Sequence, residues 1–203
     1  MKNLSKLAMC GALVCGLISA TPRAAAQGPI VTATGPEIEA HGGFEYIGQQ
    51  VPGASSVLMY GANSGLTVGV SKHVGVRLDL GYARANNVFD TGHGSDILSY
   101  MAGPVFYPLR TGRFSPYGQL LLGGARVSGA IPDGQGGSYH GYANEFAWAG
   151  GAGLEIHTSP VAAVRIGADY LHTSYFNPSA ALTGEGNIRA TVSFVFFLGG
   201  RRR

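Results

Sequence analysis

A hydroxyl, an imidazole and a carboxylate lie close together in one glycine-rich stretch of the sequence, at Ser138, His140 and Glu145. These groups could supply the nucleophile, base and orienting acid of a lipid hydrolase or acyltransferase. Such a trio arises easily by chance, and nothing else in the sequence fixes the geometry that catalysis requires. We therefore expect a protein without enzymatic activity, with a lipid-modifying enzyme as a less favoured alternative.

Three histidines could in principle ligate a metal ion: His93, His140 and His172. They fall on different predicted loops or strand ends and lack the short spacing of a zinc site. The many glycine pairs do not open helices, so the sequence contains neither a phosphate-binding loop nor a dinucleotide-binding fingerprint. We expect no metal and no cofactor.

The most informative charged residues recur at alternate positions of otherwise apolar segments. They are Glu39, Glu45, Arg77, Asp79, Glu155, Arg165, Asp169 and Arg189, with His41 and His157 on the same faces. If that face is enclosed, the acids and arginines must pair, because an unpaired buried charge carries a large desolvation cost. We expect a structural salt-bridge cluster. A gated path for protons or ions is the functional alternative.

The segments that carry these charges alternate with a period of two residues, as a β-strand between two unlike environments does. Five strands are clear: Ile38 to Tyr46, Val74 to Tyr82, Phe146 to Ile156, Val164 to Tyr170 and Ile188 to Phe196. Three more are inferred: Leu66 to Ser71 with its upstream flank, Ile97 to Tyr107 and Tyr117 to Val127. In the last, Gln119 and Arg126 fall on opposite parities, which predicts a β-bulge.

The connections between these strands alternate in length. Three are short, at 72–73, 109–113 and 159–160, and four are long, at 48–57, 84–96, 128–144 and 174–187. Eight strands of about 11 residues leave enough chain for these connections. The pattern predicts an all-β fold, an eight-stranded antiparallel up-and-down transmembrane β-barrel.

Periodicity alone does not say which face is inside, so a soluble, secreted lipocalin-like barrel is the alternative fold. Aromatic residues cluster toward strand ends, as in the girdles of membrane barrels: Tyr46, Tyr82, Tyr107, Tyr117, Tyr170 and Tyr175. The charged face also carries glycines, which a narrow lumen needs beside large side chains: Gly69, Gly75, Gly81, Gly151, Gly153 and Gly167. Both features predict charges in the lumen and an apolar face toward lipid, including Val76, Leu78, Val164, Ile166, Val192 and Phe194.

The N-terminus has the form of a secretory signal peptide, which we expect at residues 1–26. Two lysines precede an apolar run from Leu7 to Ala20, and three alanines stand before Gln27. Both cysteines, Cys10 and Cys15, fall inside this segment. The mature chain is then free of cysteine, which excludes disulfides, thiol nucleophiles and Cys-ligated zinc.

The composition excludes several other classes of protein. Apolar residues make up 45% of the chain and charged residues 12%, which disfavours disorder and a nucleic-acid-binding tail. Without the three basic residues of the signal peptide, 11 basic residues face 11 acidic ones. We expect no nucleic-acid partner. The basic tail at 199–203 is expected in solvent or against lipid headgroups.

Several short segments resemble a known family. They are Gly103 to Tyr107, Ser115 to Ala125, Ala163 to Arg165, Ala168 to Tyr170 and Val192 to Phe196. Together they are similar to the small eight-stranded outer-membrane β-barrels of Gram-negative bacteria, such as the OmpA transmembrane domain and its porin-like relatives. Members of that family usually end on an aromatic residue that the outer-membrane assembly machinery reads, whereas here Phe196-Phe197 is followed by Leu198, two glycines and three arginines.

The resemblance implies a location in the outer membrane, with outer-membrane lipid and the assembly machinery as partners. We expect a barrel over residues 27–198, a salt-bridged closed lumen, and a structural, adhesion or surface-recognition role through four long extracellular loops that could bind an extracellular ligand. A narrow pore or small-solute channel is the alternative function.

Overall fold

The computed structural model describes residues 37–50, 56–86, 88, 94–110, 112–132, 138–173 and 185–198. At 130–132, at 138–140 and at 185 it describes the backbone alone. The predicted signal peptide and basic tail lie outside these residues, as do His93 and Tyr175. Within them, no helix is long and apolar enough to cross a membrane.

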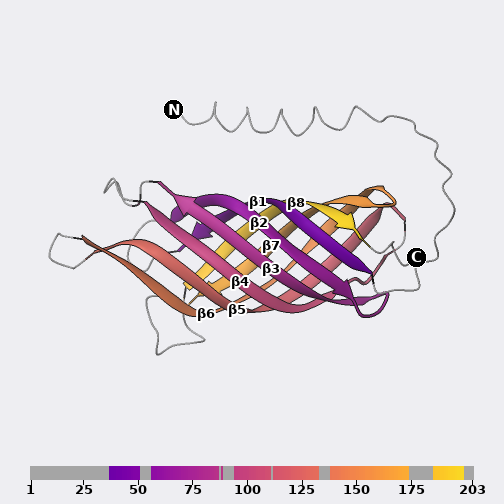
Figure 1. The fold of residues 1–203 in the computed structure, drawn as a ribbon, viewed down its shortest axis with the longest axis horizontal. Helices are drawn as coiled ribbons and strands as arrows, with labels where there is room; N and C mark the ends of the chain where they lie inside the picture. The colour runs from indigo at the N-terminus through magenta and orange to yellow at the C-terminus, as the bar shows by residue number, and fades with distance from the viewer. Residues whose placement is uncertain are drawn as a thin grey trace, which may run out of the picture. The chain divides into compact units, whose positions relative to one another are not determined.

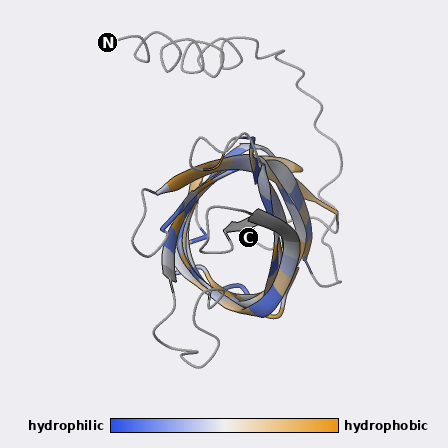
Figure 2. Cartoon of the chain, turned by 90° about the vertical axis from the view of Figure 1, so that its left-hand side faces the viewer, coloured by the Kyte–Doolittle hydropathy of each residue, from blue (hydrophilic) through white to orange (hydrophobic). Residues whose placement is uncertain are grey.

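Eight strands follow one another along the chain (Figure 1). They are β1 (Ile38–Gln49), β2 (Val57–Gly69), β3 (Val74–Ala85), β4 (Ser95–Phe106), β5 (Phe114–Pro132), β6 (Ser138–Ser159), β7 (Ala162–Thr173) and β8 (Glu185–Phe197). Each strand pairs antiparallel with the next, and β1 also pairs with β8, which closes the sheet into a barrel (Figure 2). The predicted eight-stranded up-and-down barrel is confirmed.

The two ends of the barrel differ in how the strands are connected. At one end, which we call the turn end, β1 begins, β8 ends and short turns join β2 to β3, β4 to β5 and β6 to β7. Ser71 shapes the first of these turns, because its hydroxyl accepts hydrogen bonds from the backbone N–H groups of His73 and Val74. The other four connections meet at the opposite end, which we call the loop end.

One of the predicted long loops, 128–144, is instead mostly strand. β5 and β6 run 19 and 22 residues and pair as far as Pro132 and Ser138, forming a hairpin that extends beyond the other strands (Figure 1). The pairing of β4 with β5 stops at Gly129, and that of β7 with β6 stops at Ala147. Aromatic and β-branched residues among the glycines of this stretch favour extended backbone.

The predicted bulge in β5 is also wrong. β5 keeps an unbroken register with both of its neighbours. Gln119 lies on the inward face, whereas Arg126 lies on the outward face with its guanidinium 4.4 Å from the centre of the Tyr142 ring. The register irregularity in the sheet lies in β6, between His157 and Ser159.

The outward face is apolar, and the inward face carries the buried charged residues, the reverse of a soluble barrel. In β3, for example, Leu78 is 55% exposed and its neighbour Arg77 only 2%. Val76, Ile166, Val192 and Phe194 are exposed in the same way, and Val164 is half-buried. The exposed apolar face fits hydrocarbon.

Outward tyrosine and tryptophan side chains lie toward the loop end, whereas exposed phenylalanines such as Phe106 and Phe114 lie at the turn end. Tyr46 and Tyr60 lie 5.3 Å apart between ring centres, and Trp148 and Tyr170 lie 5.6 Å apart. Tyr82 is also exposed, but Tyr107 and Tyr117 are buried inside the barrel. The prediction that these last two belong to an outward girdle is wrong, because charged partners in the lumen engage them.

Candidate functional site

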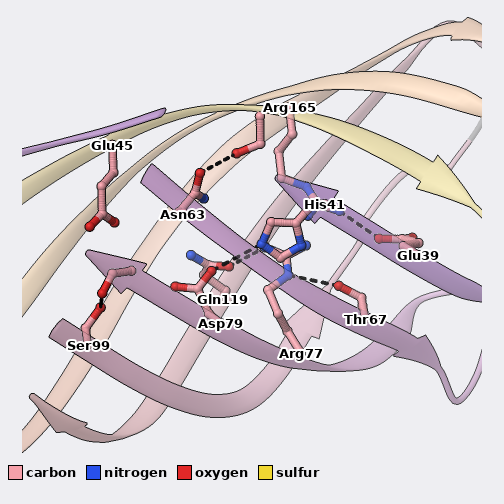
Figure 3. A network of polar contacts seen from close by, with 12 residues as sticks. Glu39, His41, Glu45, Asn63, Thr67, Arg77, Asp79, Ser99, Gln119 and Arg165 are labelled. Carbon is pink, nitrogen blue, oxygen red and sulfur yellow. Dashed lines mark hydrogen bonds and ion pairs between the residues drawn. The ribbon is translucent and has the colours of Figure 1, made fainter. Parts of the chain in front are cut away.

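The lumen contains all eight of the predicted charged residues, and none of them is more than 4% exposed. They form a lumen network, which we define as these eight side chains with His41, Thr67, Tyr107 and Gln119. Figure 3 shows part of it, with Glu39, His41, Glu45, Thr67, Arg77, Asp79, Gln119 and Arg165 labelled. The network occupies the turn-end half and the middle of the barrel.

Arg165 joins strands on both sides of the seam between β1 and β8. Its Nη2 donates to Oε2 of Glu39 at 2.7 Å and to Oε1 of Glu155 at 2.6 Å. The Tyr107 hydroxyl oxygen lies 3.0 Å from Glu155 and 3.1 Å from Glu39. Two buried carboxylates therefore share one guanidinium and one phenol.

Arg189 is the centre of a second group, nearer the middle of the barrel. It donates to Asp79 at 2.7 Å and to Asp169 at 2.8 Å, so that β8 is tied to β3 across the lumen and to its neighbour β7. His41 lies 3.2 Å from the other oxygen of Asp79. Each oxygen of Asp79 therefore has a partner.

Arg77 and Gln119 connect the two groups. Arg77 donates to Thr67, to the Tyr107 hydroxyl and to the Gln119 carbonyl oxygen. The amide nitrogen of Gln119 donates to Asp169 at 2.7 Å. The lumen network is thus continuous from the turn end to mid-barrel.

Glu45 is the exception among the predicted charges. Its carboxylate is buried, and neither oxygen has a hydrogen bond. The nearest cation is Nη1 of Arg189 at 3.9 Å, which already donates to Asp79. The structure gives this acid little compensation for its burial.

Arg110 closes the lumen at the turn end. It comes from the turn between β4 and β5, and its guanidinium pairs with Glu37 at 2.5 Å and Glu39 at 2.8 Å. It lies 3.7 Å from the centre of the Tyr107 ring. Burial lowers the pKa of Arg110, but Tyr107 and the two carboxylates outweigh that effect and hold the pKa above its usual value.

Glycines on the inward face make room for the large side chains. A Cβ at Gly151 would collide with Oδ1 of Asp169, and one at Gly81 would lie 2.6 Å from Oε2 of Glu45. The Tyr117 ring lies over two more, Gly153 and Gly167, where an added Cβ would be 2.5 Å from its hydroxyl. Small residues beside large ones let a narrow barrel be filled.

The loop-end half of the lumen contains an apolar layer, with buried polar residues such as Gln49, Thr173 and Asn187 at its outer end. Buried side chains from seven strands form this apolar layer: Ile47, Val57, Met59, Ala83, Ala85, Ile97, Met101, Leu121, Ala125, Ala147, Ala149 and Leu171. The sequence argument assigned only polar and glycine residues to the inward face. It missed this layer because in loop-end stretches such as Val57 to Tyr60 and Ala147 to Ala149 both faces are apolar, which removes the alternation.

The residues considered for catalysis and metal binding are not brought together. Ser138, His140 and Glu145 all lie on β6, where His140 and Glu145 are five positions, or about 17 Å, apart along the strand. His172 is buried against Trp148, with the two rings stacked at 5.4 Å. Among the described residues, no three His, Cys, Asp or Glu side chains could hold a metal ion.

Several residues of the lumen could not be found from charge alternation. The network members Tyr107, Gln119 and Thr67 are uncharged. Arg110 and Glu37, which pair at the turn end beside the network, lie outside the alternating segments. His157 does lie on the inward face, 3.0 Å from the Ser115 hydroxyl and away from His41. The position of Tyr117 opposite two glycines is the one sequence signal that could have placed an aromatic residue inside.

A family model described as the outer membrane protein β-barrel domain matches residues 10–196. The chain belongs to this family. The family includes small eight-stranded barrels of the bacterial outer membrane. The barrel described above is of this kind. No match was found among curated proteins.

Solved structures share the fold of this outer-membrane barrel. The attachment invasion locus protein Ail of Yersinia pestis, in complex with the heparin analogue sucrose octasulfate, is 18% identical with a TM-score of 0.56, covering 80% of this chain and 99% of that one. Neisserial surface protein A is 11% identical with a TM-score of 0.58, covering 79% and 96%. A major outer membrane protein of Thermus thermophilus is 11% identical with a TM-score of 0.53, covering 81% and 100%.

Proposed function

We propose that this chain is a non-enzymatic surface protein whose barrel is a closed anchor and whose loop end recognises or adheres to a partner outside the cell. It reaches the outer membrane after cleavage of residues 1–26 and is inserted by the assembly machinery. The observation that carries the proposal is the filled lumen, in which an ion-paired network lies under an apolar layer. Such an interior suits anchoring rather than transport.

The β5–β6 hairpin supports a recognition role. It extends the sheet past the ends of the other strands and so presents backbone and side chains beyond the membrane-spanning part of the barrel. Connecting segments that a rigid scaffold positions are where binding residues concentrate. Two of the similar structures are named for attachment and invasion and for the surface, and we extend to this chain a surface location but not their ligands.

A narrow pore is the second candidate function. The continuous lumen network offers polar groups from the turn end to the middle of the barrel, which is the part of a path that such a pore needs. Single-channel recording in planar bilayers separates the two candidates. We expect no stable conductance steps from the folded barrel, and reproducible ohmic steps would favour the pore.

Cysteine labelling tests the orientation. Ser56 is exposed at the loop end and Lys72 at the turn end, so each can be replaced by cysteine in a mature chain that is expected to have none. Ser56→Cys should react with a membrane-impermeant maleimide on intact cells, and Lys72→Cys only after the outer membrane is permeabilised. The reverse pattern would contradict the proposed orientation.

A further inference from the structure

Glu45 is the one acid of the lumen network to which no hydrogen bond is made. Its side chain is completely buried, neither carboxylate oxygen has a hydrogen-bond partner among the described residues, and no dashed line reaches it in Figure 3. The nearest guanidinium nitrogen, Nη1 of Arg189, lies 3.9 Å away and already donates to Asp79 at 2.7 Å. Buried charges are normally paired or coordinate metal ions, so this carboxylate lacks a counter-charge of its own.

The charges of the lumen balance near the turn end but not in the middle of the barrel. Near the turn end three acids face three arginines: Glu37, Glu39 and Glu155 against Arg77, Arg110 and Arg165. In the middle, Asp79, Asp169 and Glu45 share Arg189. His41, which lies 3.2 Å from Asp79, can add at most one positive charge. Among the described residues, the middle therefore keeps at least one negative charge without a partner.

Glycines let the Glu45 side chain extend over β2 and β3 toward β4. Glu45 of β1 is opposite Gly61 of β2, and Gly81 of β3 is opposite Ser99 of β4. A Cβ built on Gly81 would have three oxygen atoms as its nearest contacts from other strands. They are Oε2 of Glu45 and Oγ of Ser99, both at 2.6 Å, and Oε1 of Glu45 at 2.8 Å. The missing side chain of Gly81 thus leaves a place between a carboxylate and a hydroxyl, which we call the Gly81 cradle.

The Gly81 cradle lies directly under the apolar layer. On β1, β3 and β4, the next inward side chains toward the loop end belong to this layer and are completely buried: Ile47, Ala83 and Ile97. They separate the Glu45 carboxylate from water at the loop end. Ser99 is also completely buried, and its hydroxyl makes one long hydrogen bond, 3.5 Å to the backbone oxygen of Gly81. The Ser99 oxygen therefore faces the cradle as a second possible ligand.

We propose that the Gly81 cradle binds one small monovalent cation of the size of Na⁺. The Glu45 carboxylate and the Ser99 hydroxyl are oxygen ligands of the kind that hard cations take, and water completes the coordination. One positive charge matches the one unpartnered carboxylate. A divalent ion is not favoured, because no three His, Cys, Asp or Glu side chains among the described residues are grouped to hold it. The site belongs to the lumen and is independent of what the loop end recognises.

Urea unfolding of the refolded barrel in phosphatidylcholine vesicles tests the proposal, with NaCl compared with tetramethylammonium chloride at equal ionic strength and pH. Tetramethylammonium is too large for the cradle, so the wild-type barrel should be more stable in NaCl. Above the dissociation constant, each tenfold rise in Na⁺ should raise the ratio of folded to unfolded protein about tenfold, as binding to one site of the folded state does. A crystal grown with thallium(I) acetate should show an anomalous peak between the Glu45 carboxylate and the Ser99 hydroxyl.

Three variants separate the cradle from the rest of the lumen. Glu45→Gln keeps the shape of the side chain and removes its charge, so it should abolish the response to Na⁺ and be at least as stable as the wild type in tetramethylammonium chloride. Ser99→Ala should weaken the response, because one ligand is lost. The matched control Glu37→Gln removes an acid that is paired with Arg110, so it should lower the stability but keep the response to Na⁺.

Equal responses to Na⁺ in the wild type and in Glu45→Gln would overturn the proposal, as would a thallium-grown crystal without a peak beside Glu45. A third result would also overturn it. If the stability of the wild type does not respond to Na⁺ but rises relative to that of Glu45→Gln as the pH is lowered, Glu45 carries a proton in place of a metal ion. These measurements on the refolded barrel do not depend on which end of it faces the outside of the cell.

Discussion

Arg165 is the side chain on which the turn-end part of the lumen network depends most. Replacing it with leucine leaves Glu39 and Glu155 buried without their shared guanidinium. We expect Arg165→Leu to lower the free energy of unfolding by about 3 kcal/mol, as the loss of one partner of a buried pair does. Urea titration in lipid vesicles measures this. The matched variant Arg113→Leu, at an exposed turn position, should cost little, and equal losses for the two would mean that Arg165 is solvated.

Glu45 and Asp79 are two buried acids, and only Asp79 has hydrogen bonds that offset the desolvation cost of its burial. Asp79 bonds to Arg189 and His41, whereas Glu45 has no hydrogen bond. We expect Asp79→Asn to cost about 3 kcal/mol and Glu45→Gln less than about 1 kcal/mol, because the second change removes a poorly compensated charge. The same unfolding titration compares them. A larger loss for Glu45→Gln would show that Glu45 has an ionic role that its geometry does not reveal.

For single residues, the alternation in the sequence was enough to place the charged side chains on one face of the strands. It could not say which acid pairs with which arginine, because Arg165 and Arg189 each have, besides an acid on the adjacent strand, a partner from a strand far away in the chain, Glu39 and Asp79. Uncharged members such as Tyr107 gave no charge signal. Arg110 lies in a turn, where the period of two residues does not apply.

At the scale of the strands, inward-facing glycines leave the space that large side chains fill in the lumen. Valine at Gly153 would collide with the Tyr117 ring and the backbone oxygen of Ile166, whereas at Gly118 the nearest atom to an added Cβ is 3.8 Å away. We expect Gly153→Val to lower stability by about 2 kcal/mol through overpacking and Gly118→Val to change it little. Thermal unfolding in detergent checks the pair. Equal melting temperatures for the two would mean that the lumen can expand.

The outward face of β7 provides a test of the membrane assignment. Ile166 is exposed at mid-strand, and arginine there should cost about 2 to 4 kcal/mol in lipid. Val161, exposed in the turn between β6 and β7, should tolerate arginine at much lower cost. Folding yield and unfolding free energy in vesicles measure both variants. In addition, Ile166→Cys should be quenched by a lipid-borne probe, which a residue packed inside a soluble barrel would resist.

The number and order of the strands could be predicted from the sequence, since each has at least one stretch of alternating residues. The length of β5 and β6 could not, because their outer ends are rich in glycine and polar residues that also suit a loop. The wrong prediction of a bulge at Arg126 also comes from the unpredicted length of β5. The outward position of Arg126 becomes intelligible once β5 is seen to continue beyond the hydrocarbon, where a cation on the outer face is tolerated.

The extended hairpin and the barrel should be separable units of the molecule. In the segment 130–140, the described residues pair only with one another, from Ala130 opposite His140 to Pro132 opposite Ser138. Replacing them with an Asn-Gly turn between Gly129 and Gly141 should leave the barrel folded, since this dipeptide suits a two-residue hairpin. The folded form should still migrate differently from the heated form in gel electrophoresis. Loss of that difference would mean that the hairpin is needed for folding, while loss of cell adhesion alone would support its role in recognition.

The ion pairs that cross the lumen also constrain the route by which the barrel is made. Arg165 and Glu39 are 126 residues apart, and Arg189 and Asp79 are 110 apart, so neither pair can form until the first and last strands approach each other. In an unclosed sheet Arg165 and Arg189 keep only their partners on the adjacent strands, Glu155 and Asp169, so the charged face is incompletely paired and hydrocarbon does not admit it. Entry into the bilayer and closure of the β1–β8 seam must therefore be one concerted event, and a nascent sheet has to keep its future lumen hydrated until the ends meet. A chain without its last strand would be arrested at the membrane surface.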